Sequence, residues 1–175
     1  MENFEYFNTN TLSQHLVLRK DETKFGEKIK YPSNQEVSLS DFLNETKASF
    51  IVFGIKEFAG IKANFGRVGD THSWDVFLSS FLNIQNNKYL KASNVSVIGC
   101  LDYKKYDEEI ARLNPNISED LQRLYEIVSE IDKDVTYLNT LIHRAGKKAI
   151  VIGGGHNNAY GNIKGLALAK GKSVN

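Results

Sequence analysis

The chain has 175 residues, of which 41% are hydrophobic and 25% are charged, and its formal net charge at pH 7 is +1. This composition is typical of a globular protein with one sizeable core and shows no sign of disorder. Because the chain is nearly neutral and has no cluster of lysine and arginine, the composition argues against nucleic acid and membranes as partners.

The first ten residues, "MENFEYFNTN", are acidic and polar, whereas a secretory signal needs a basic patch and an apolar stretch. No apolar run approaches the length of a membrane span. Cys100 is the only cysteine, so it forms no internal disulfide, and we predict a small buried side chain rather than a nucleophile. We expect a cytoplasmic protein.

In chain order, residues 1–45 come first and are less periodic than the rest, with a short helix expected after Ser40. We expect this lead-in segment to pack on the sheet of a single domain that spans residues 1–175. Three apolar, β-branched runs follow, each stopped by glycine or a turn, and they predict buried strands over 48–54, 94–103 and 147–155.

Helices are predicted between and after these strands. Residues 72–84 place apolar side chains at helical spacing. Residues 118–146 form a longer apolar stripe with an acidic start, a basic end and a glycine stop. The segment 159–171 reads as a third helix, weakened by Gly161 and Gly165.

This alternation of strands and helices predicts a three-layer α/β/α fold with a mostly parallel sheet. In such sheets, ligands bind where the loops leave the carboxyl ends of the strands. The loops concerned are 54–70, 99–106 and 153–158. The candidate site therefore lies at this edge.

The last of these loops begins the stretch "GGGHNNAYG", residues 153–161. A glycine turn between a strand and a helix can bind phosphate through backbone N–H groups. The specific phosphate motifs are absent, because G-x-G-x-x-G requires glycine where Asn158 stands, and Leu166 replaces the first glycine of a Walker A loop. By spacing alone, His156 has either a structural or a functional role.

Two other polar stretches are weaker candidates for metal binding. Asp132 and Asp134 point to different sides of a helix, so we expect them to be solvated rather than to share an ion. Asp70, His72 and Asp75 are suitable ligand types for Mn²⁺ or Mg²⁺, but the intervening serine is better explained as a helix cap.

Residues 153–165, "GGGHNNAYGNIKG", resemble the G-G-[DG]-H motif and following helix of the ureohydrolase family, which includes arginase, agmatinase and formimidoylglutamase. The positions that match this pattern are Gly153, Gly154, His156, Ala159, Gly161, Ile163 and Gly165. Glycine at 155 is similar to the formimidoylglutamase branch. Residues 53–87 are similar to the first strand, loop and helix of bacterial formimidoylglutamases, including the N-x-G-R element from Asn64 to Arg67. Together with "SVIGCLDY", the resemblance spans most of 50–175.

The resemblance implies an arginase-like fold and a site with two Mn²⁺ ions that activate a water for attack on an amidine carbon. His156 would be one metal ligand, with the backbone of Gly153, Gly154 and Gly155 close to the metal. Asn64 and Arg67 would bind the substrate, Arg67 through a carboxylate. The implied reaction hydrolyses N-formimidoyl-glutamate to glutamate and formamide in histidine degradation.

The sequence departs from the family pattern in two ways. Gly155 replaces an aspartate that orients the histidine in some members, and Asn157 stands where many relatives carry an acid. The D-x-H-x-D and later D-x-D motifs, which supply the family's remaining ligands, do not follow the glycine turn here. We therefore expect this chain to be the amino-terminal half of such an enzyme, metal-free and inactive alone.

Two groups of alternatives stay open. Arginase and agmatinase are the near ones. A substrate with an acidic tail needs Arg or Lys in the loops, whereas agmatine has no carboxylate, and Arg67 and Lys62 favour the acidic tail. From another class, the chain would be a complete, non-catalytic α/β module that binds a nucleotide or a partner, with His156 as a structural turn residue. A fragment would expose apolar surface, so we also expect self-association into a homo-oligomer.

Overall fold

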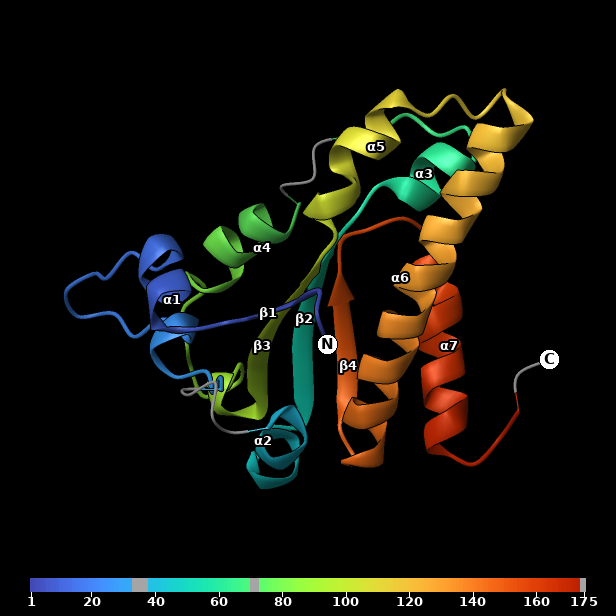
Figure 1. Ribbon diagram of the computed structural model, residues 1–175. Helices are drawn as coiled ribbons and strands as arrows, with labels where there is room; N and C mark the ends of the chain where they lie inside the picture. The colour runs from blue at the N-terminus through green and yellow to red at the C-terminus, as the bar shows by residue number, and fades with distance from the viewer. Residues whose placement is uncertain (33–37, 70–72, 174–175) are drawn as a thin grey trace.

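The computed structural model describes residues 1–32, 38–69 and 73–173. Within these ranges four strands form one open sheet in the spatial order β1-β3-β2-β4 (Figure 1). The strands are β1 (Phe4–Tyr6), β2 (Phe50–Lys56), β3 (Val95–Asp102) and β4 (Lys148–Ile152). β2 pairs in parallel with β3 and with β4, whereas β1 pairs antiparallel with β3. The α/β class is confirmed, and the three predicted strands are β2, β3 and β4.

The helices of the described residues are α1 (Thr9–His15), α2 (Leu39–Glu45), α3 (Ala59–Ala63), α4 (Ser73–Phe81), α5 (Asp107–Arg112), α6 (Ser118–Arg144) and α7 (Asn158–Ala169). Short 3₁₀ turns lie at Phe25–Glu27, Ala92–Asn94 and Lys104–Tyr106. The four predicted helices correspond to α2, α4, α6 and α7. In the described part of the chain, no helix combines the length and the apolarity needed to cross a bilayer.

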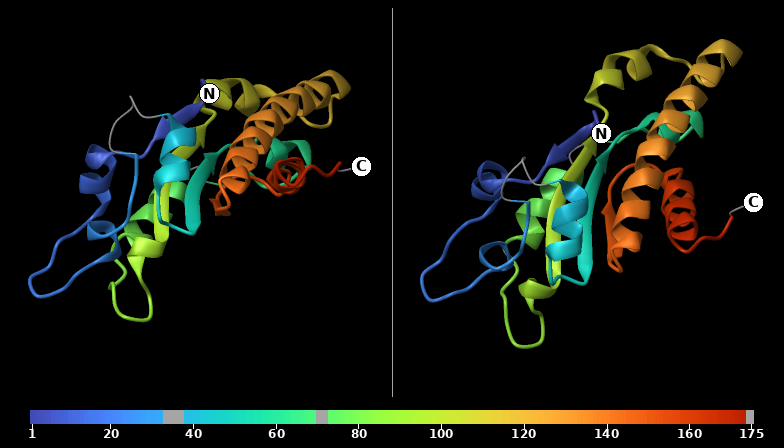
Figure 2. Two further views of the ribbon diagram at one scale, coloured as in Figure 1. Left: turned by 90° about the horizontal axis from the view of Figure 1, so that it is seen from below. Right: turned by 60° about the horizontal axis from the view of Figure 1, so that its bottom comes forward.

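Helices pack on both faces of the sheet because the side chains of β2 alternate. Ile51, Phe53 and Ile55 join a cluster with α2 and α6, whereas Val52 joins a second cluster with Trp74 of α4. The Trp74 ring packs over β2 at Gly54, where a Cβ atom would lie 2.4 Å from the indole. Figure 2 shows α6 and α7 side by side, across the sheet from α4.

The lead-in segment contributes a strand that the sequence analysis did not predict. β1 is only three residues long and is joined to β3 by backbone pairing, with Glu5 opposite Cys100. Gly99 has φ of +138°, and a Cβ atom there would lie 2.0 Å from the Glu5 carbonyl oxygen. Cys100 is buried, as predicted.

α6 and α7 run parallel and approach each other at two glycines of α7. A Cβ atom at Gly161 would lie 2.7 Å from the Val135 side chain, and one at Gly165 would lie 2.5 Å from Cβ of Asn139. The Asn139 amide also donates a hydrogen bond to Asn162 Oδ1 at 2.9 Å. The glycines that weaken α7 as an isolated helix therefore allow close helix packing.

The expectation that Asp132 and Asp134 are simply solvated is wrong. Both are half-buried, because α6 lies against the sheet on one side and against α7 on another. Asp134 accepts hydrogen bonds from Asn3 (2.8 Å) and from the Tyr103 hydroxyl (3.0 Å). As predicted, the two carboxylates face different surroundings.

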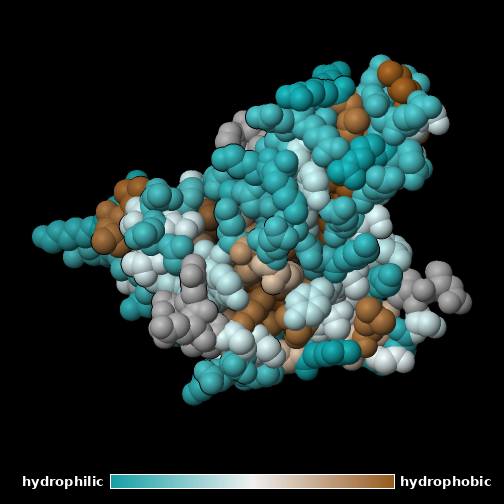
Figure 3. All heavy atoms as spheres, viewed as in Figure 1, coloured by the Kyte–Doolittle hydropathy of each residue, from teal (hydrophilic) through white to brown (hydrophobic). Residues whose placement is uncertain are grey.

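The surface seen in Figure 3 is hydrophilic over α5 and the adjoining part of α6, with hydrophobic patches elsewhere, including over α7. β4 stands at the end of the strand order, with Ile150 exposed at its middle. On α7, Tyr160 and Ile163 are exposed by half or more.

Candidate functional site

The glycine turn lies at the carboxyl edge of the sheet, as predicted. β4 ends at Ile152, and the turn leads into α7 through Gly153 and Gly154, whose φ angles are +89° and +72°. Added Cβ atoms would also collide with their neighbours, at 2.8 Å from the Ile55 carbonyl oxygen for residue 153. Glycine is therefore required by both the backbone conformation and the close approach of β2.

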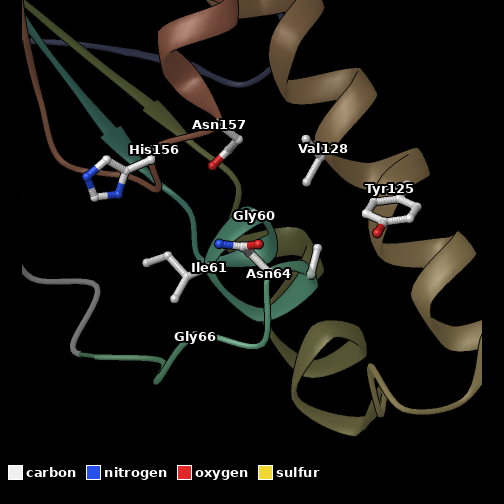
Figure 4. Close-up of a pocket in the computed structure, with 9 residues that line it drawn as sticks. Gly60, Ile61, Asn64, Gly66, Tyr125, Val128, His156 and Asn157 are labelled. Carbon is white, nitrogen blue, oxygen red and sulfur yellow. The ribbon is translucent and has the colours of Figure 1, made fainter.

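His156 is exposed at the tip of this turn, beside a cavity of about 410 Å³. The cavity is lined by α3 and the loop after it, by α6 and by the turn: Gly60, Ile61, Ala63, Asn64, Gly66, Tyr125, Val128, His156 and Asn157. In Figure 4 the imidazole points away from Tyr125 and Val128, and the Asn64 amide lies across the cavity near Gly60. The structure thus brings Asn64 and His156 to one cavity.

A second cavity, of about 230 Å³, also borders the turn. It is lined by Ile55, Glu57, Phe58, Ile61, Gly69, Ser73, Gly153 and Gly154. The turn therefore contributes to two cavities, one beside α6 and one at the start of α4.

Glu57 lies beneath the turn and was missed by the sequence analysis. Its side chain is 4% exposed. Its carboxylate accepts hydrogen bonds from the backbone N–H of Gly155 (2.5 Å), from the Asn158 amide (2.9 Å) and from the backbone N–H of Gly60 (3.2 Å). The available signal was an acidic residue directly after a buried strand, at the edge where ligands bind.

Asn157 is folded between the turn and α3. A Cβ atom at Gly60 would lie 2.0 Å from its Oδ1, and one at Gly155 would lie 2.3 Å from the same atom. Neither polar atom of this side chain has a hydrogen-bond partner among the described residues, although both are buried. An aspartate in place of Gly155 therefore does not fit unless Asn157 moves.

The remaining predicted residues are less closely associated with the turn. Arg67 is exposed and lies outside the two sets of cavity-lining residues given above. Lys62 Nζ donates to the carbonyls of Ile110 (2.6 Å) and Ala111 (2.9 Å), so this lysine fastens α3 to α5. In the alternative metal stretch, Asp70 and His72 lie outside the described residues, and Asp75 lies 3.6 Å from Lys56 Nζ.

The turn is poorly arranged as a phosphate cradle. The Gly155 N–H is already bound to the Glu57 carboxylate. The N–H groups of Asn158 and Ala159 donate to carbonyls of the turn itself, at 3.2 and 3.1 Å. A phosphate at the start of α7 would compete for these donors and would be repelled by Glu57.

The chain was also compared with family models, curated proteins and solved structures. None of them matches this chain. The family assignment therefore remains a prediction from the residues.

A metal centre needs several donor side chains close together. Within residues 1–32, 38–69 and 73–173, no three His, Cys, Asp or Glu side chains are grouped closely enough to hold a metal ion. His156 offers one accessible imidazole donor. These residues by themselves do not fit a centre of two Mn²⁺ ions, which needs several ligands from carboxylates or imidazoles.

Proposed function

We propose that the chain carries part of the active site of a metal-dependent hydrolase of linear amidines, with N-formimidoyl-glutamate as the substrate. The observation that carries this proposal is the exposed His156 on a glycine turn, beside a cavity that also contains Asn64. In the proposal His156 is one metal ligand, and the other ligands come from polypeptide beyond the described residues. The chain by itself is then inactive. The arginase-like fold and the mostly parallel sheet belong to the same proposal.

The cavity supports a substrate of amino-acid size, since about 410 Å³ falls within the usual range of small-molecule sites. Asn64 offers an amide that can donate to or accept from an amidine or a carboxylate. Because Lys62 is held by backbone carbonyls, Arg67 is the better candidate to bind an acidic substrate tail. Arginase and agmatinase activities are the near alternatives.

The binding-module alternative is less well supported. The backbone donors that a nucleotide phosphate would use are already occupied, and a buried carboxylate lies beneath them. This arrangement favours the hydrolase proposal over a nucleotide-binding module.

Paramagnetic Mn²⁺ tests the role of His156 directly. In NMR spectra of the full chain, we expect weak binding that broadens the ring signals of His156 more than those of His143. His143 serves as an internal control because its Nδ1 lies 3.0 Å from the Lys147 carbonyl oxygen. The His156→Ala variant should abolish the localised effect. Equal broadening of both histidines would contradict the proposal, and tight calorimetric binding of two ions would contradict the inactive, metal-free state.

The substrate class is tested by saturation-transfer NMR with N-formimidoyl-glutamate, arginine and agmatine. We expect the largest signal from N-formimidoyl-glutamate and a weaker one in the Asn64→Ala and Arg67→Ala variants. A stronger agmatine signal would instead favour the agmatinase alternative, since agmatine has no carboxylate. An increase in melting temperature with nucleotides, and not with these amidines, would favour the binding module.

A further inference from the structure

The Glu57 carboxylate joins two loops that are far apart in the sequence. One oxygen accepts from Gly155 in the turn after β4 and from Asn158 at the start of α7, and the other accepts from Gly60 at the start of α3. Gly155 and Glu57 are separated by 98 positions. An ionised carboxylate only accepts hydrogen bonds, so it is matched to these three donors.

The hydrogen bonds to the Glu57 carboxylate are stronger than ordinary ones. Glu57 is 4% exposed, and hydrogen bonds to a charged acceptor are about twice as strong as neutral ones. Larger residues in the turn would press against the carboxylate, since a Cβ atom at Gly154 would lie 3.1 Å from Oε1 and one at Gly155 would lie 3.2 Å from it, so one of the atoms would have to shift. Gly154, Gly155 and the Glu57 carboxylate therefore pack against one another as one unit.

This unit connects two walls of the larger cavity. Gly60 belongs to the α3 wall that continues to Asn64, and Gly155 directly precedes His156. Loss of the carboxylate would remove these hydrogen bonds between the turn and α3. Packing contacts, such as that of Asn157 with Gly60, would then be left to hold the imidazole in position relative to Asn64.

We propose that Glu57 is a positioning residue, which holds the glycine turn against α3 and so orients His156 toward its ligand. The proposal rests on the proposed function for the identity of that ligand. The hydrogen bonds and the burial carry the positioning itself.

The test compares the full-length wild type with Glu57→Gln, which keeps the side-chain shape but replaces one acceptor oxygen with a donor. Glu22→Gln, at an exposed position, is the control for charge. Amide hydrogen exchange of Gly155 and Gly60, and the NMR order parameter of the His156 amide, are measured without metal at one pH. We expect exchange at one or both glycines to become roughly tenfold to a hundredfold faster, from the strength of a hydrogen bond to a charged group. The His156 order parameter should fall, and Glu22→Gln should change neither.

A second variant, Asn158→Ala, removes one donor and leaves the carboxylate, so it applies if Glu57→Gln does not fold. We expect a smaller acceleration at Gly155 with this variant. Unchanged exchange and an unchanged His156 order parameter would overturn the positioning role.

Mn²⁺ broadening of His156 then separates the two proposals. If the wild type shows it, Glu57→Gln should weaken it at His156 and leave the background at His143 unchanged, and equal broadening in both proteins would overturn the positioning role. If the wild type shows none, the metal-ligand proposal fails, while the metal-free measurements still decide whether Glu57 positions His156.

Discussion

We expect the ionised Asp132 carboxylate to destabilise the folded protein at neutral pH. This half-buried carboxylate on α6 has one oxygen, Oδ1, that is buried without a hydrogen-bond partner among the described residues. Burial, and next the negative charge of Glu57, raise the pKa of Asp132 from 3.8 to about 6, although Lys164 opposes this change. We predict that Asp132→Asn stabilises the protein at neutral pH.

The direction in which stability changes with pH follows from the number of protons bound by the folded and unfolded chains. Well below pH 4 the carboxyl is protonated in both the folded and the unfolded chain, so it contributes no pH-dependent penalty. Between about pH 4 and 6 the folded chain binds more protons, and its stability therefore falls as pH rises. Above about pH 6 the penalty is nearly complete. A difference of roughly two pKa units at about 1.4 kcal/mol each sets its upper limit at about 3 kcal/mol, and solvent screening at this half-buried position reduces it.

The assay is urea unfolding of the wild type and Asp132→Asn between pH 4 and 8. We expect the variant to be more stable by about 1 to 3 kcal/mol at pH 7.5 and to lose this advantage near pH 4. Asp21→Asn is the matched control, since Asp21 is exposed and its φ of +66° is tolerated by asparagine. The reasoning is refuted if Asp132→Asn is no more stable than the wild type at pH 7.5, or if its advantage is the same at every pH.

Packing and exposure also determine how the protein responds to a substitution between α6 and α7, to a thiol reagent and to increasing concentration. Gly165→Leu should lower the free energy of unfolding by about 3 kcal/mol, because α6 leaves no space for a side chain. Lys170→Leu, at the exposed residue directly after α7, should change it by less than about 0.5 kcal/mol, and denaturant unfolding of both variants checks this. Cys100 should react with a thiol reagent only after unfolding, because it is buried and burial raises its pKa to about 12. At pH 8 this leaves about a thousandfold less thiolate than a pKa of 9 would. Rapid labelling of the native chain would contradict this expectation. The chain should self-associate with increasing concentration. Ile163 is 60% exposed, and Ile163→Glu should reduce the mass measured by light scattering. A wild-type chain that stays a monodisperse monomer would contradict the expected association.

The regular elements that bury a continuous apolar pattern could be predicted from the sequence. β2, β3 and β4 are short β-branched runs ended by turns, and their hydrophobic pattern alone specifies buried strands. α6 has an apolar stripe, an acidic first turn, a basic last turn and Gly146 in the left-handed conformation after it, so its limits were also readable. His156 could be selected because it follows a strand and a run of glycines at the carboxyl edge.

Contacts between distant segments were decided only by the tertiary structure. β1 is held by backbone pairing to β3, which leaves little trace in the side-chain pattern of three residues. Gly161 and Gly165 read as weak points of a helix, and only the approach of α6 explains them. Hydropathy likewise placed Asp132 in solvent, although neighbouring elements half-bury it.

At the candidate site, the sequence predicts the strand before Glu57, whereas only the tertiary structure shows the partners of its side chain. Its sequence neighbours reveal an acidic residue after a strand, but its partners Gly155 and Asn158 lie about a hundred positions away. Local pattern therefore determined the strands, the long helix and the position of His156, because each depends on residues close together in the chain. The hydrogen bonds of Glu57 near His156 depend on parallel strands that bring two distant loops to one edge of the sheet. Those loops are neighbours only in the folded protein.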